Sequence, residues 1–147
     1  MRRLLGTLIV LLLLAAGTTA CGSDSGDAAD DASPSVEPVT VAILSRTAAG
    51  GEVSPRAVPL PDAAAVGRFA EQFEDPAFGR EIAARVAATE VPEGRELVGA
   101  VVAIGCDVPE SVTVTPLADG VSIVADKVTS PMLECFAAVT SVALVLV

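Results

Sequence analysis

The sequence predicts an α+β domain in which two helices pack on a mostly antiparallel sheet of about five strands. Two helical patterns with one apolar stripe each follow one another between residues 62 and 86. One β-branched run precedes them and four strand-like runs follow them. Because helices and strands are grouped along the chain rather than alternating, this order indicates helices against a mostly antiparallel sheet, with the strand order left open.

The first strand is expected at residues 39–45, which read Val-Thr-Val-Ala-Ile-Leu-Ser. Alternation places Val39, Val41 and Ile43 on one face of this strand. Two adjacent glycines at 50 and 51 and three prolines between 55 and 61 then predict a loop without regular structure.

Two consecutive helices are predicted next, over residues 62–74 and from Pro76 onwards. Asp75 is placed to cap the second helix, and Pro76 occupies its first helical position, where a missing N–H does no harm. Apolar residues recur at three- and four-residue spacing in both helices, so both stripes are expected to face the core. The stripes consist of Val66, Phe69 and Phe73 in the first helix and of Phe78, Ile82 and Val86 in the second.

Four further strands are predicted in the second half of the chain. Residues 96–106 are almost continuously apolar, which indicates a strand covered on both faces at the centre of the sheet. Residues 112–115 and 121–125 flank an Ala-Asp-Gly turn and should form a hairpin. The run from Cys135 to Val147 is apolar to its last residue, and we expect it to form an interior strand.

The first twenty-one residues combine two arginines, an uncharged apolar run at residues 4–16 and small residues before Cys21. This order is typical of a secretory leader. Since a cysteine follows the small residues directly, the segment resembles the lipobox of bacterial lipoproteins, although Thr18 stands where that family usually has Leu, Val or Ile. The resemblance implies that Cys21 carries a diacylglycerol group and becomes the mature N-terminus. An ordinary cleaved leader or an uncleaved anchor over residues 4–20 is the alternative.

These features predict a signal peptide at residues 1–20, a lipidated cysteine and disordered acidic tether at 21–38, and a single domain at 39–147. Residues 22–38 contain five acids and no base, a composition that cannot offset its ordering entropy. Four aspartates of this segment lack the spacing of an EF-hand calcium loop. All nineteen acidic residues and seven of the nine basic ones follow residue 20, so the mature net charge is −12. Nucleic acid is therefore not an expected partner, and a lipid anchor rather than a basic patch would hold the protein at the membrane.

Two cysteines remain after Cys21, namely Cys106 and Cys135, and a disulfide is expected between them outside the cytoplasm. Two free buried thiols and a redox-active pair are the alternatives, but no C-x-x-C spacing supports the latter. Cys106 closes one predicted strand and Cys135 opens another. We expect this start-to-end placement to require parallel neighbouring strands or a long bend.

No enzyme activity, cofactor or metal is predicted. The chain has no histidine, which excludes Ser-His-Asp and Cys-His catalysis and most zinc sites. Its one lysine, Lys127, lies outside any S-x-x-K motif, and the glycines fit neither phosphate-binding nor dinucleotide-binding spacing. Four acids around the helix junction are better explained by capping and by the helix dipole than by catalysis. They are Glu71, Glu74, Asp75 and Glu81.

The strand rhythm after residue 103 and a Gly-x-x-x-Pro at Gly105–Pro109 resemble the small β-rich C-terminal domain of PrcB-type protease-complex proteins. The Gly-Gly-Tyr that follows the turn in that family is absent, so we carry over no protease-related role. The layout of leader, tether and small domain resembles short lipoproteins of high-GC Gram-positive bacteria, a class that implies no activity.

The sequence thus favours a membrane-anchored extracytoplasmic lipoprotein that binds another envelope protein or stabilises an envelope complex. The alternative function is a carrier of a small apolar or lipidic ligand. In that case small side chains opposite Val66, Phe69, Phe78 and Ile82 would leave a cavity between the helices and the sheet.

Overall fold

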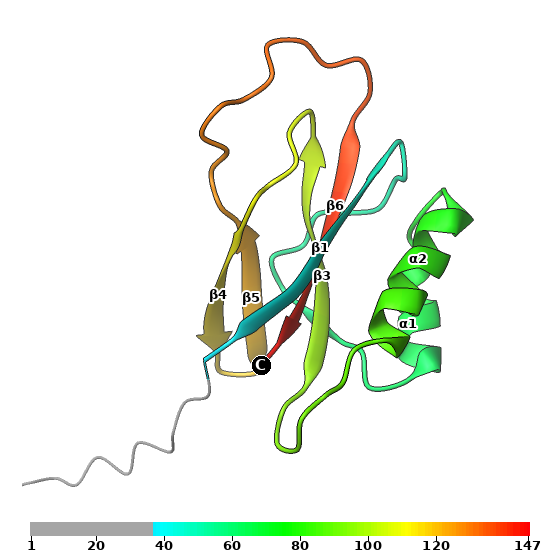
Figure 1. Ribbon diagram of the computed structural model, residues 1–147, viewed down its shortest axis with the longest axis vertical. Coiled ribbons are helices and arrows are strands. Elements are labelled where there is room, and N and C mark those ends of the chain that lie inside the picture. The colour runs from blue at the N-terminus through cyan, green and yellow to red at the C-terminus, as the bar shows by residue number, and fades with distance from the viewer. Residues whose placement is uncertain (1–36) are drawn as a thin grey trace, which may run out of the picture. The chain divides into compact units, whose positions relative to one another are not determined.

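The computed structural model describes residues 37–147, whose elements are arranged in layers (Figure 1). The expected signal peptide, Cys21 and all but the last two residues of the expected tether lie outside the described residues. Six strands and two helices follow one another in the order β1 (Val39–Thr47), β2 (Val58–Pro59), α1 (Ala63–Ala70), α2 (Pro76–Ala87), β3 (Leu97–Gly105), β4 (Val112–Leu117), β5 (Gly120–Ala125) and β6 (Val139–Leu146).

The main sheet has four strands in the order β1-β6-β3-β2, and all neighbouring pairs are antiparallel. Strand β6 lies between β1 and β3, which confirms the prediction that the last apolar run forms an interior strand. Its first residue, Val139, pairs with Thr47 on one side and with Gly105 on the other. Strand β3 is buried over its first six residues, as predicted for a strand covered on both faces.

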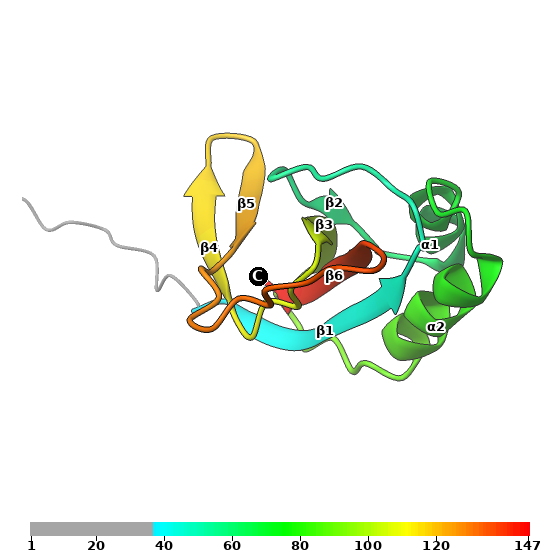
Figure 2. The same ribbon diagram turned by 90° about the horizontal axis from the view of Figure 1, so that it is seen from above.

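The prediction of about five strands in one sheet is wrong, because β4 and β5 form a separate two-stranded sheet. Since both faces of β3 and β6 are apolar, the second face needs a cover, and the hairpin provides it on the side opposite the helices (Figure 2). Ile123, which is fully buried, packs from β5 against Val98, Ala100 and Val145. Two backbone hydrogen bonds, from Ala57 to Val121 (3.0 Å) and from Ile123 to Pro55 (2.7 Å), fasten the hairpin to the chain that leads into β2.

Strand β2 lies within the stretch predicted to be a loop. It has only two residues, Val58 and Pro59, which pair with Gly99 and Val98 of β3. Proline has no N–H to donate to a further neighbour, so this short strand suits the edge of a sheet.

Strand β1 departs from the predicted alternation. The register between β1 and β6 shifts between Thr40 and Ala42, so Val41 is the extra residue of a β-bulge. As a result Val41 and Leu44 pack against the helix-side core, whereas Ile43 packs against the hairpin-side core. The prediction that Val41 and Ile43 share a face is therefore wrong.

Both helices start as their sequences predict. The carboxylate of Asp62 accepts a hydrogen bond from the N–H of Ala65 (2.7 Å), and that of Asp75 accepts one from the N–H of Ala77 (2.8 Å). Helix α1 ends at Ala70, earlier than predicted, because Phe73 forms an isolated β-bridge with Gly50.

The helix stripes face the main sheet and fill the space beneath the helices. Phe78 and Ile82 are completely buried, and Phe73 lies edge-on to Phe69 and Phe78 at centroid distances of 5.7 and 5.0 Å. Neither helix in residues 37–147 has the length and apolarity needed to cross a bilayer.

Candidate functional site

A long segment without regular structure, residues 126–138, connects β5 to β6 (orange to red in Figure 1). It lies at the end of the main sheet where β6 begins, opposite the end where Val39 pairs with Leu146. Every residue from 129 to 138 is exposed. Three large apolar side chains lie among them: Met132 is 60% exposed, Phe136 97% and Leu133 101%. We call these three residues the apolar tip.

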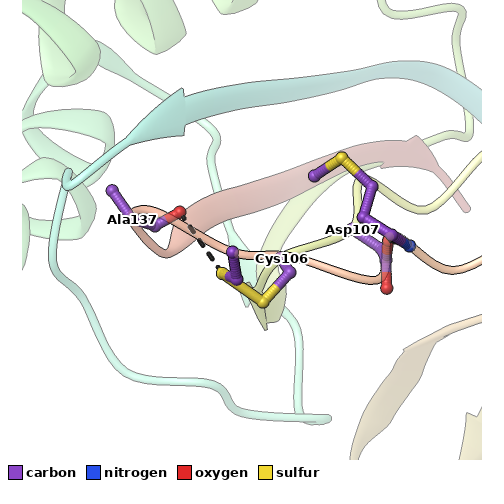
Figure 3. Close-up of a disulfide and its surroundings, with 5 residues drawn as sticks. Cys106, Asp107 and Ala137 are labelled. Carbon is purple, nitrogen blue, oxygen red and sulfur yellow. Dashed lines mark hydrogen bonds between the residues drawn. A yellow bond between two sulfur atoms is a disulfide. The ribbon is translucent and has the colours of Figure 1, made fainter.

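The disulfide between Cys106 and Cys135 holds this segment to the end of β3 (Figure 3). Its Cα atoms are 5.2 Å apart, and Cys106 directly follows Gly105, the last residue of β3 to pair with β6. The expectation that such a bond requires parallel neighbours or a long bend is wrong. The end of one strand meets the start of its antiparallel neighbour, which is where these two cysteines lie.

A second anchor next to the disulfide involves Asp107. Its carboxylate accepts a hydrogen bond from the backbone N–H of Met132 (2.7 Å), which joins the tip to the turn after β3. The carbonyl oxygen of Ala137 lies 3.7 Å from the sulfur of Cys135 (dashed in Figure 3). Because a disulfide sulfur carries no hydrogen, this is a contact and not a hydrogen bond.

The two ends of the segment are also fixed. At its start, the carboxylate of Asp126 accepts hydrogen bonds from the hydroxyls of Ser111 and Thr113, both at 2.6 Å. These bonds, the one from Ser111 first, lower the pKa of Asp126 because they stabilise the charged form. At its end, the carbonyl of Ala138 accepts a hydrogen bond from Ala48 (2.8 Å). The apolar tip is thus exposed on a segment that is held at four points.

The sequence did not identify the apolar tip. Phe136 was expected inside the last strand, but β6 begins only at Val139. Strands β1 and β3 end at Thr47 and Gly105, so residues before Val139 have no neighbour with which to pair. The apolar run over residues 135–147 is longer than the first predicted strand, residues 39–45. This difference in length could have indicated that the run extends past its neighbouring strand.

The surroundings of the tip are acidic. Asp107, Glu110, Asp126 and Glu134 lie in the connections that follow β3 and β5, where Lys127 is the single base, so these two connections have a net charge of −3. Glu110 and Glu134 are exposed, and neither forms an ion pair with another residue of the 37–147 region. We call Glu110 and Glu134 the acidic rim.

The carboxylates at the helix junction have structural roles. Asp75 caps α2, and its second oxygen lies 3.6 Å from the guanidinium of Arg46. Arg46 also pairs with Glu81 and lies over the ring of Phe78, 5.9 Å from its centroid. The hydrogen bond that the guanidinium of Arg46 donates to the carboxylate of Glu81 raises the pKa of Arg46. Glu71 and Glu74 form no ion pair among the described residues, whereas the carboxylates of Asp75 and Glu81 both contact the guanidinium of Arg46.

The alternative function requires a cavity between the helices and the sheet, opposite Val66, Phe69, Phe78 and Ile82. Phe78 and Ile82 are fully buried in the core, and Phe69 lines two smaller hollows together with Val58. Val66 lines a larger hollow beside both helices. This hollow has a volume of about 290 Å³ and lies between α1, α2, the chain that follows α2 and the start of β3. Its walls are mainly aliphatic and include Leu60, Ala83, Val86, Val91 and Leu97.

Within residues 37–147, no three side chains of the metal-binding types come together in a way that could hold a metal ion. Lys127 is exposed in the segment that carries the apolar tip. No protein-family model, no curated protein and no solved structure matches this chain.

Proposed function

We propose that the protein is a membrane-anchored extracytoplasmic lipoprotein whose domain is a non-catalytic protein-binding module, with the apolar tip as its contact surface. The exposure of Leu133 and Phe136 is the observation that carries this proposal. Burying a side chain of this size stabilises by about 1.5–3 kcal/mol, and here that free energy is not used within the described fold.

The anchoring of the segment supports a binding role. A binding loop loses conformational entropy when it becomes ordered, which weakens association. The disulfide and the bond from Met132 to Asp107 restrict the tip before any partner arrives. A few large, well-placed side chains usually provide most of the binding energy of an interface, and aromatic residues are frequent among them.

Membrane attachment through Cys21 is the second part of the proposal, and it rests on the leader pattern. Two acyl chains hold a protein stably at a bilayer, where one chain holds it only marginally. The seventeen residues that follow Cys21 would give the domain a reach of roughly 20–25 Å if they behave as a flexible chain. The apolar tip lies at the end of the sheet away from Val39, and its exposed side chains are available to other envelope proteins.

Site-specific photocrosslinking tests the binding role. A photoreactive amino acid is placed at position 133 or 136 of the full chain in intact membranes, and as a control at Val124, which is 51% exposed on the hairpin. We expect the tip positions, and not position 124, to crosslink to one reproducible protein that mass spectrometry identifies. Equal, low crosslinking at all three positions would refute the proposed surface. The intact mass of the membrane-extracted protein tests the anchor, since a protein that retains residues 1–20 or an unmodified Cys21 would refute it.

A carrier function is the second candidate, and the hollow between α1 and α2 favours it. Its volume of about 290 Å³ is at the lower end of the range for small-molecule sites. Native mass spectrometry of the purified protein should then show a bound apolar species, which Ala83→Leu would displace by filling the hollow. A spectrum without any bound species would refute this candidate.

A further inference from the structure

We propose that the partner of the apolar tip is a protein with an apolar pocket surrounded by lysine and arginine residues. This inference rests on the proposed function and adds the chemistry of the partner to it. The acidic rim is the observation that carries it. Glu134 directly follows Leu133 of the tip, and Glu110 lies in the connection after β3 that also contains Asp107. Neither glutamate forms an ion pair within the described part of the chain.

The position of the charges favours a basic partner. Of the four acids in this region, Glu110 and Glu134 are exposed and Asp107 and Asp126 are partly buried, and Lys127 is the one base among them. Among the arginines of the described residues, Arg46 lies at this end of the sheet, where it pairs with Thr140, but its guanidinium is engaged by Asp75 and Glu81. The others lie on the helices and in the chain before β2 and β3. Complementary charges around an apolar contact accelerate association and exclude wrong partners, while the apolar centre supplies most of the affinity.

The same charges argue against a lipid bilayer as the occupant. Anionic headgroups would repel a region of net charge −3, and the protein after residue 20 carries a net charge of −12.

A second copy of this chain is a poorer fit than a basic protein. The open groove on the outer side of α1 and α2 is large enough for an aromatic side chain, with a volume of about 440 Å³. However, the charged residues that line it are Glu71 and Arg80, whose charges cancel. Each copy would in addition carry a net negative charge, which opposes the association of two copies.

Charge-neutral variants of the rim test the proposal in the full chain at the membrane. Glu110→Gln with Glu134→Gln is combined with the photoreactive residue at position 133, and Glu90→Gln with Glu93→Gln serves as the control. The control pair is exposed, lies in the connection between α2 and β3 at the other end of β3, and changes the net charge equally. We expect the rim variant to lower the crosslinking yield by about two- to fivefold per charge, with a smaller effect at high salt, and the control to leave it unchanged.

The sequence of the crosslinked peptide shows which kind of surface the partner presents to the tip. The proposal is supported if the peptide comes from an apolar pocket with adjacent lysine or arginine residues and if the rim variant lowers the crosslinking yield. A protein crosslink of unchanged yield in the rim variant overturns the basic rim but leaves the binding role intact. A crosslink to another copy of this chain overturns the proposed partner. Absence of any protein crosslink at position 133 refutes the underlying function instead.

A single tryptophan distinguishes the bilayer from a protein. The chain contains no tryptophan, so Leu133→Trp introduces one reporter at the tip. The full-length variant is reconstituted into phosphatidylcholine vesicles with brominated acyl chains, with Val124→Trp as the control. Equal, weak quenching at both positions supports a protein partner. Strong quenching at position 133 alone would show that the tip enters the bilayer and would overturn the proposal.

Discussion

The Cα atoms of Cys106 and Cys135 lie 5.2 Å apart, just past Gly105 and Val139, the last pair of the β3–β6 ladder. Cys106 directly follows Gly105, and Cys135 precedes Val139 by four residues. The disulfide thus continues the contact between the two strands beyond their last backbone pair. It also closes a segment with a sequence separation of 29 residues that contains the whole β4–β5 hairpin. The bond therefore fixes both the second layer of the fold and the apolar tip.

Replacing both cysteines by serine should lower the free energy of unfolding by about 3–4 kcal/mol, because the unfolded chain regains the freedom of a closed segment of this length. Urea denaturation followed by far-UV circular dichroism measures the change. The wild-type protein under reducing conditions is the control and should match the double variant. An unchanged urea midpoint would show that the bond does not restrict the unfolded chain.

Leu133→Ser and Phe136→Ser should change stability by less than about 0.5 kcal/mol, since both side chains are almost fully exposed. Phe78→Ala, in the buried core, should instead cost about 3–5 kcal/mol. Thermal melts compare the three variants. A large loss of stability in the tip variants would mean that these side chains support the fold and are not reserved for a partner.

Thr140→Val should destabilise the domain by about 1–3 kcal/mol although it hardly changes the shape of the side chain. The buried hydroxyl of Thr140 donates a hydrogen bond to the carbonyl of Gly50 (2.8 Å), and valine leaves this carbonyl without that donor. Thr115→Val, at an exposed position of β4, is the matched control and should be nearly neutral. Equal urea midpoints for the two variants would contradict this assignment.

Asp126 should make stability depend on pH on the acid side. Folding lowers its pKa through the hydroxyls of Ser111 and Thr113, so the unfolded chain binds the proton more tightly. The stabilisation is fully present above the ordinary aspartate pKa of about 3.9 and is lost as the pH falls through the lowered value in the folded state. NMR titration of the carboxyl carbon should show that Ser111→Ala raises this pKa towards its ordinary value, whereas Ser122→Ala does not. An unaltered titration in Ser111→Ala would rule out the Ser111 hydroxyl as the main cause of the lowered pKa.

The local signals of the sequence predicted the elements better than their assembly. Asp75 and Pro76 mark the start of α2 because a cap depends only on nearby residues. The same is true of the turn at Gly120, where a backbone φ of 132° favours glycine. Such features need no knowledge of the rest of the fold.

The assembly depended on distant pairings that no local pattern encodes. Val41 leaves the expected alternation because β1 is bulged opposite β6, about a hundred residues further along the chain. Phe136 lies outside β6 because the neighbouring strands end too early to pair with it. The apolar tip was missed for this reason. The sequence pattern of an apolar run is the same whether the run continues a strand or extends past the ends of the neighbouring strands.

The central position of β6 determines when the protein can fold. Both β1 and β3 need β6 as their common neighbour, so the main sheet cannot form until residues 139–146 have been synthesised. Contacts between segments so far apart form slowly, because a long stretch of chain must close before they are made. The main sheet is therefore complete only when β1, from the start of the domain, and β3 have both paired with β6.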